Sequence, residues 1–153
     1  MEKNKTYDSV LAAKYLLALA AKKGHSLNVT KVQKLLFIAY GYFLAKYGHA
    51  FLKEKPKAWP YGPVFPRTRK KVDYSIIYRT EDQEFTEIAA DLEVTQLFEH
   101  LIDTYAKYTA NQLSEWSHMV GSPWDKTRQQ KGFDWNAEIP DNVIENYFLQ
   151  VDV

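Results

Sequence analysis

The four histidines are the side chains in this sequence best suited to proton transfer or metal binding. They are scattered at His25, His49, His100 and His118, and none lies at a metal-site spacing from a second type of ligand. His25 and His49 each follow a glycine that can end a helix, where the helix dipole favours a histidine. We interpret both as loop residues, and the sequence predicts neither a metal nor a cofactor.

His118 has the strongest case for chemistry, because Glu115 and Asp125 lie close to it in the sequence. A carboxylate that oriented the imidazole would make His118 a general base. The alternative is a buried histidine that caps the next helix or bonds to a backbone carbonyl. We favour this structural role, because the chain has no P-loop, GxGxxG, HExxH or GxSxG motif, and we predict that the protein is not an enzyme.

The segment Trp59–Pro66 reads WPYGPVFP, and Pro56 precedes it. Each proline fixes its own φ and biases the residue before it toward extended geometry, so the segment should be a stiff, irregular connection. It could be a preorganised aromatic platform for a partner, since rigid aromatics dominate binding hot spots. It could also have a structural role, with Trp59 and Tyr61 packed under the helix that precedes it. We expect Trp59 and Tyr61 to anchor the fold, while exposed neighbours choose the partner.

Arg67, Arg69, Lys70 and Lys71 form a single basic cluster in the sequence. Such a cluster can contact nucleic-acid phosphates or an acidic partner, or it can be the solvated face of a short helix. The formal net charge is only +1, so we favour the solvated face and consider a nucleic-acid partner improbable.

The composition indicates an ordinary globular domain in a reducing compartment. The absence of cysteine excludes disulfides and thiolate catalysis. The polar N-terminal segment MEKNKTYDS does not resemble a signal peptide, and the apolar stretches fall short of the roughly 20 residues that span a bilayer. The sequence therefore predicts a soluble, cytoplasmic protein of one domain over residues 1–153.

Apolar periodicity and capping residues predict a mostly α, compact single-domain bundle of about six helices. An aromatic and proline-rich loop interrupts it, and the β-prone residues 73–84 could hold a small hairpin or an extended segment. The expected helices run from Ser9 to Lys23, Thr30 to Gly48, Pro63 or Val64 to Val72, Leu92 to Tyr108, Thr109 to Met119, Pro123 to Gln130, and onward from Pro140.

The second helix has the clearest pattern. Thr30 and Gln33 match a capping box at its start. Lys31, Lys34 and Lys46 lie off its apolar stripe, and we expect them to face solvent.

Three segments resemble the Panacea antitoxin domain family, which includes phage-associated GepA-like and SocA-like proteins. Residues 31–48 resemble the KLQKLLY helix of that family, residues 58–66 its A-W-x-Y-G-P-V-x-P motif, and residues 113–124 its L-S-x-x-T-H-x-x-x-P-W motif. Ser117 replaces a usual threonine, and Phe37-Ile38 replaces a Tyr-rich pair. The motif positions carried over are Lys31, Gln33, Lys34, Trp59, Tyr61, Gly62, Pro63, Pro66, His118, Pro123 and Trp124.

The resemblance implies a non-catalytic antitoxin that binds and neutralises a toxin, commonly one encoded by an adjacent gene. One branch of the family resembles a proteolytic adaptor, which implies the alternative of delivering a target to a ClpXP-type protease. The third alternative is an enzyme or nucleic-acid binder that uses His118 or the basic cluster.

Overall fold

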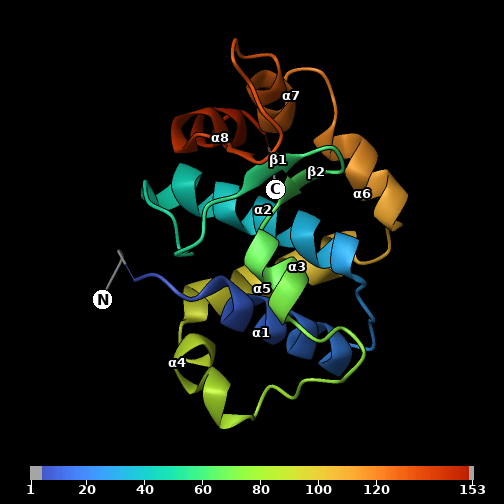
Figure 1. Ribbon diagram of the computed structural model, residues 1–153. Helices are drawn as coiled ribbons and strands as arrows, with labels where there is room; N and C mark the ends of the chain where they lie inside the picture. The colour runs from blue at the N-terminus through green and yellow to red at the C-terminus, as the bar shows by residue number, and fades with distance from the viewer. Residues whose placement is uncertain (1–4, 152–153) are drawn as a thin grey trace.

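The computed structural model describes residues 5–151 and is mostly helical (Figure 1). Within this range the helices are α1 (Ser9–Lys22), α2 (Val29–Tyr47), α3 (Pro66–Lys71), α4 (Thr86–Ala89), α5 (Leu92–Tyr105), α6 (Ala110–Ser117), α7 (Pro123–Arg128) and α8 (Asp141–Phe148), with a 3₁₀ turn at Gln83–Phe85. The strands are β1 (Lys57–Trp59), β2 (Gly62–Val64) and β3 (Ala137–Glu138).

Helix α2 is the centre of the molecule. It contacts α1 and α5 on one side, α8 and α6 on the other, and the hairpin strand β2 across its N-terminal half (Figure 1). Every residue from Val32 to Gly41 is buried, which is the expected state of a helix covered all round. Gly41 allows the closest of these contacts, because a Cβ there would lie 2.1 Å from the Phe148 ring on α8.

The start of α2 corrects the predicted capping box. The N-cap is Asn28, whose side chain accepts the N–H of Lys31. The side chain of Gln33 bonds instead to Phe65 and Thr68 in a distant segment. The Gln33 side chain is therefore used in tertiary contacts and not in a local capping box.

The hairpin of β1 and β2 lies within the proline-rich segment, and β3 comes from the C-terminal part of the chain. Residues 73–84, which we considered for a hairpin or an extended segment, contain no strand. β1 pairs antiparallel with β2 through Trp59↔Gly62 and Ala58↔Pro63, and with β3 through Ala58↔Ala137. Pro63 is tolerated because β2 is an edge strand, where a missing N–H breaks no ladder. The 3₁₀ turn begins within residues 73–84, at Gln83, and α4 follows it.

The other predicted helices are confirmed, with ends that differ by a few residues. Thr109 and Gln112 form the capping box of α6, and Ser122 caps α7 with Pro123 in its first turn. Gly48 ends α2 in the left-handed conformation, at φ 77°.

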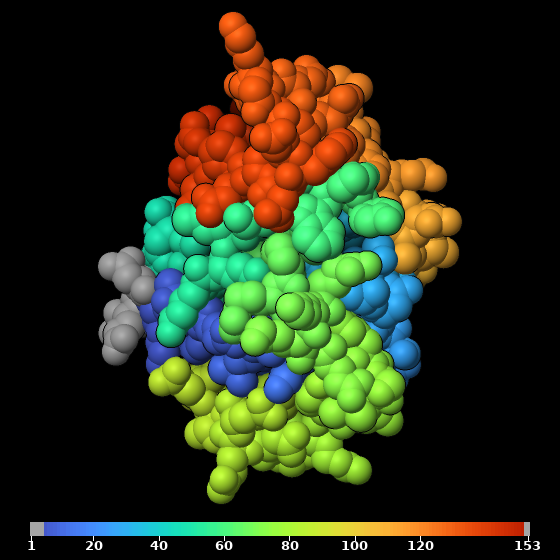
Figure 2. Space-filling model, in the orientation of Figure 1, coloured from blue at the N-terminus to red at the C-terminus, as the bar shows by residue number. Residues whose placement is uncertain are grey.

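The hairpin and α3, in green, form part of the outer surface of the domain (Figure 2). They lie between the C-terminal segments above and the α4 region below. Across residues 5–151, no helix combines the length and apolar character needed to cross a membrane.

Candidate partner-binding site

A pocket of about 500 Å³ lies between the hairpin and the first turns of α2 and α6; we call it the motif pocket. It brings together seven of the motif positions from three distant parts of the chain: Gln33, Lys34, Trp59, Tyr61, Gly62, Pro63 and His118. The other lining residues are Val29, Thr30, Pro60, Val64, Arg69, Ala110, Asn111 and Ser114.

Lys34 lies at the base of this pocket and is only 2% exposed, which corrects the prediction that it faces solvent. Its Nζ donates to the carbonyl oxygen of Tyr61 at 2.9 Å and, more weakly, to that of Pro63 at 3.5 Å. Within residues 5–151 it forms no ion pair with a carboxylate, and burial lowers the pKa of Lys34 to about 8. Lys34 therefore holds the hairpin turn with a charge that has no counter-ion.

Gly62 explains how the hairpin approaches Lys34 so closely. Its φ of 114° is one that other residues rarely adopt. A Cβ at Gly62 would lie 2.7 Å from Lys34 Nζ, 2.8 Å from Ser117 Oγ and 3.3 Å from His118 Nε2. The glycine thus packs its backbone directly against three polar side-chain atoms.

The ring of His118 packs against Trp124, with 4.2 Å between ring centroids. Burial and then the charge of Lys34 lower the pKa of His118. The Tyr61 backbone opposes this shift, but Nε2 is buried and makes no hydrogen bond of normal geometry with any residue in the described range.

Asp125 does not orient His118. Its carboxylate accepts from the Gly121 N–H and Gln129 Nε2, and it pairs with Arg128 at 3.1 Å. The alternative that we weighed, a general base oriented by Asp125, is therefore not formed. The expected cap on the next helix comes from Ser122, so His118 is not that cap either.

The side chain of Gln33 closes a ring of hydrogen bonds beside the pocket. Its Oε1 accepts the N–H of Phe65 at 2.6 Å, and its Nε2 donates to Thr68 Oγ1. The Thr68 hydroxyl in turn donates to the Phe65 carbonyl at 2.8 Å. Since all these groups are buried, the ring satisfies polar atoms that would otherwise be costly.

Two tryptophans connect the hairpin to the C-terminal third of the chain. Trp124 Nε1 donates to the Trp59 carbonyl at 2.7 Å, and Trp59 Nε1 donates to Asn136 Oδ1 at 2.8 Å. Arg69 lies over the Trp59 ring, 5.6 Å from its centroid. Trp59 thus anchors the fold, as we expected.

Tyr61 does not anchor the fold through its side chain, which is 69% exposed. Its contribution to the fold comes from the backbone, whose carbonyl oxygen accepts from Lys34. Four motif positions lie outside the motif pocket, and one of them is Trp124. Pro66 and Pro123 begin α3 and α7, and Lys31 Nζ donates to the Ala106 carbonyl at 3.0 Å.

The basic cluster is dispersed over α3. Arg67 pairs with Asp8 at 2.7 Å, Arg69 covers Trp59, and Lys70 and Lys71 are exposed. Two of the four side chains are therefore held by contacts within the fold. In addition, no group of three or more His, Asp or Glu side chains in residues 5–151 is placed to hold a metal.

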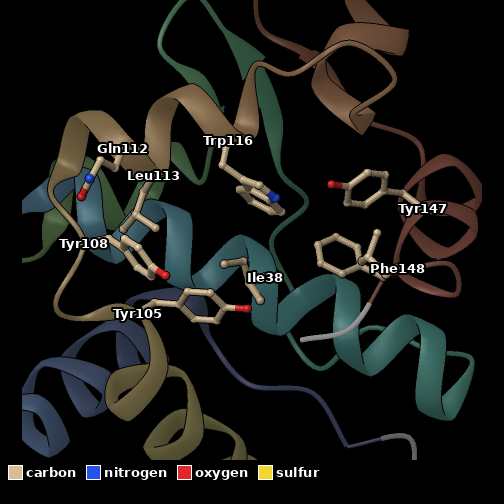
Figure 3. Close-up of a pocket in the computed structure, with 9 residues that line it drawn as sticks. Ile38, Tyr105, Tyr108, Gln112, Leu113, Trp116, Tyr147 and Phe148 are labelled. Atoms are coloured by element: carbon tan, nitrogen blue, oxygen red, sulfur yellow. The ribbon is translucent and has the colours of Figure 1, made fainter.

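A second cavity of about 340 Å³, which we call the aromatic pocket, opens between α6, α8 and the end of α5. Figure 3 shows the rings of Tyr105, Trp116, Tyr147 and Phe148 turned toward a common space above Ile38. The Trp116 ring contacts those of Tyr147 and Phe148 edge-on. Sequence reasoning did not single out this pocket, because its residues are core-type side chains from separate amphipathic helices.

Sequence reasoning also missed Asn111, Ser114 and Asn136, which contribute polar groups near the motif pocket. Of these three residues, Asn136 has a type that fits its backbone conformation and could have been noticed in the sequence. It adopts a φ of 84°, which asparagine tolerates better than most residues, but its use depends on a partner 77 positions away.

The fold and this pocket place the chain in a known class of proteins. The family model for SocA-like antitoxins with a Panacea domain matches residues 32–125. This range holds every residue of the motif pocket except Val29 and Thr30. Since it covers more than half of the chain, the protein belongs to the SocA-like Panacea antitoxin family.

The chain is also similar to Antitoxin SocA of Caulobacter vibrioides, at 27% identity over 154 residues. The alignment covers 92% of this chain and 82% of that protein. No solved structure matches the chain. An antitoxin family implies a toxin as the kind of partner to expect.

Proposed function

We propose that this protein is a non-catalytic antitoxin that neutralises a cognate toxin by direct contact in the cytoplasm. The observation that carries the proposal is its membership of an antitoxin family, through a match that contains nearly all of the motif pocket. The whole of residues 1–153 then acts as one antitoxin domain, and the toxin is the product of an adjacent gene.

The geometry of the site supports a binding role over an enzymatic one. The Asp125 carboxylate accepts from the Gly121 N–H and does not orient His118. The polar atoms of Gln33 and Thr68 are already hydrogen-bonded within the fold. The exposed aromatic ring of Tyr61 lies at the edge of a preorganised pocket. Rigid aromatic groups of this kind lose little entropy on binding and are frequent hot spots.

Co-expression with the product of the adjacent gene tests the proposal. We expect that product to stop growth alone, growth to return when this protein is present, and the two proteins to co-purify. Ile77→Ala is a suitable control, because this exposed side chain lies away from the motif pocket. Toxicity that persists in the presence of the intact antitoxin would contradict the proposal.

The abundance of the toxin separates occlusion from delivery to a protease. If the antitoxin only covers its partner, the level of toxin stays constant and the complex accumulates. A fall in toxin level that requires a ClpXP-type protease would instead support the adaptor alternative.

A further inference from the structure

We propose that the motif pocket binds a carboxylate of the partner polypeptide, with the Lys34 ammonium, the Arg69 guanidinium and the first N–H groups of α2 and α6 as its donors. The carboxylate belongs to an aspartate or glutamate side chain or to a chain terminus. The identity of the partner as a toxin rests on the proposed antitoxin function, whereas the chemistry of the pocket does not.

The first observation is the charge balance of the pocket. Its lining includes Lys34, Arg69 and His118 but no aspartate or glutamate. The charge of Lys34 is almost fully buried, and its hydrogen-bond partners among residues 5–151 are two carbonyl oxygens. A buried charge without a counter-ion costs several kcal/mol, and an incoming carboxylate would supply the missing opposite charge. One of the three ammonium hydrogens is still available for it.

The second observation is that two helices begin at this pocket. Val29 and Thr30 open α2, and Ala110 and Asn111 open α6. The caps satisfy only the N–H groups of Lys31 and Gln112, so these four N–H groups have no partner among the described residues. Unpaired N–H groups and the positive ends of two helix dipoles both favour an anion.

The third observation is an unpaired polar atom of the pocket wall. Nε2 of His118 is buried and makes no hydrogen bond of normal geometry within residues 5–151, and it lies near Lys34, Gly62 and the Tyr61 backbone. Native structures rarely leave buried polar atoms unpaired unless a further group completes them. A carboxylate oxygen or a water molecule bound with it would do so.

The shape of the pocket favours a peptide over a nucleic acid. Trp59, Pro60 and Pro63 form apolar walls that suit the methylene groups next to a carboxylate. A nucleic acid instead presents a row of phosphates and needs an extended basic surface. Here Arg67 is neutralised by Asp8, and the net charge of the chain is only +1.

Titration of the isotope-labelled protein with short capped peptides tests the inference, with the indole N–H signals of Trp59 and Trp124 as reporters. The probes are acetyl-Gly-Glu-Gly-amide, acetyl-Gly-Gln-Gly-amide and acetyl-Gly-Gln-Gly with a free carboxylate. Inorganic phosphate and a single-stranded oligonucleotide are tested in parallel. We expect binding of the two carboxylate peptides and at least about tenfold weaker binding of the neutral one. Which of the two carboxylate peptides binds more tightly separates a side chain from a chain terminus.

Two substitutions on α3, one inside the pocket and one outside it, provide a matched pair. Arg69→Gln should weaken the carboxylate peptides about five- to tenfold, whereas Lys70→Gln, on the same helix but outside the pocket, should not. Equal binding of the neutral peptide, binding of only phosphate or the oligonucleotide, or no binding at all would overturn the inference. Co-purification with the toxin is measured separately. Failure of the carboxylate test therefore leaves the antitoxin function standing, and failure of co-purification leaves carboxylate binding standing.

Discussion

The motif pocket and the aromatic pocket use different faces of α6 and are built on opposite principles. Asn111, Ser114 and His118 face the first, whereas Leu113 and Trp116 face the second. In the motif pocket, backbone groups and buried polar atoms set the geometry. The aromatic pocket is formed mainly by ring surfaces, which can shift without breaking a hydrogen bond.

This difference indicates how each region should respond to change. The hydrogen bonds that Lys34 donates and the backbone angle of Gly62 permit little adjustment, so a substitution that adds atoms at Gly62 should have a large effect. A substitution among packed rings lowers the free energy of unfolding in proportion to the contact that is lost, and the remaining rings can partly repack. Substitutions at Gly62, Gly41, Lys34 and Tyr61 test this contrast.

Gly62→Ala should lower the free energy of unfolding by more than about 3 kcal/mol, because the new Cβ meets Lys34 and Ser117 in a disfavoured backbone conformation. Urea denaturation measures the change. Gly121→Ala is the matched control, since Gly121 also has a positive φ but no atom within 4 Å of its Cβ position. It should cost about 1–2 kcal/mol, and equal losses for both variants would show that the close approach at Gly62 is unimportant.

Gly41→Ala tests the wall of the aromatic pocket. The Cβ would overlap the Phe148 ring, and we expect a loss of about 1–3 kcal/mol even though alanine favours a helix. If the ring can move, Gly41→Ala with Phe148→Leu should recover part of this loss beyond additivity. A loss as large as that of Gly62→Ala would remove the proposed contrast between the two pockets.

Lys34→Met should change the free energy of unfolding at pH 7 by less than about 2 kcal/mol, because the gain from removing a buried charge is offset by the loss of the hydrogen-bond donor to the Tyr61 and Pro63 carbonyls. In the native chain, folded Lys34 loses its proton near a pKa of about 8, whereas an unfolded lysine keeps it to about 10.5. Between these values the unfolded state binds more protons. Stability should therefore rise with pH, by at most about 1.4 kcal/mol per pH unit.

Denaturation curves from pH 7 to pH 10 measure this slope. Lys34→Met should abolish it, while Lys31→Met, on the same helix and only partly buried, should retain it. A flat profile for the native chain would show that burial does not disfavour the charged form of Lys34.

Tyr61→Ala should change the free energy of unfolding by less than about 0.5 kcal/mol, because its side chain is largely exposed. If this ring contacts the toxin, the same change should weaken the complex at least about tenfold. Calorimetry of the purified pair checks this against Ile77→Ala, which should alter neither quantity. Unchanged affinity for Tyr61→Ala would place the toxin contact elsewhere, with the aromatic pocket as the next surface to test.

Local sequence signals predicted the helices well because their causes are local. Thr109 with Gln112, and Ser122 with Pro123, satisfy N–H groups within one helical turn, and both act as expected. The hairpin was missed because prolines argue against strands. The structure places Pro60 in the two-residue turn and Pro63 on an edge strand, where neither disrupts pairing.

Seven of the eleven family-motif positions line the motif pocket, but the sequence did not predict how these residues are used. The helical pattern left Lys34 off the apolar stripe, which normally means solvent. Its burial depends on the hairpin and α6, which fold over it from 25 or more positions away. The pairing of β1 with β3 likewise depends on contacts distant in sequence that no local pattern encodes.

The ring formed by Gln33, Phe65 and Thr68 has a consequence for how the protein opens. Phe65 lies between β2 and α3, in neither element, yet its amide is held by a buried side chain of the central helix. Its hydrogen can exchange with solvent only when α2, the hairpin and α3 separate together. Hydrogen exchange at this one amide should therefore be as slow as in the middle of α2, and a single loop residue would report the cooperative unfolding of the whole domain.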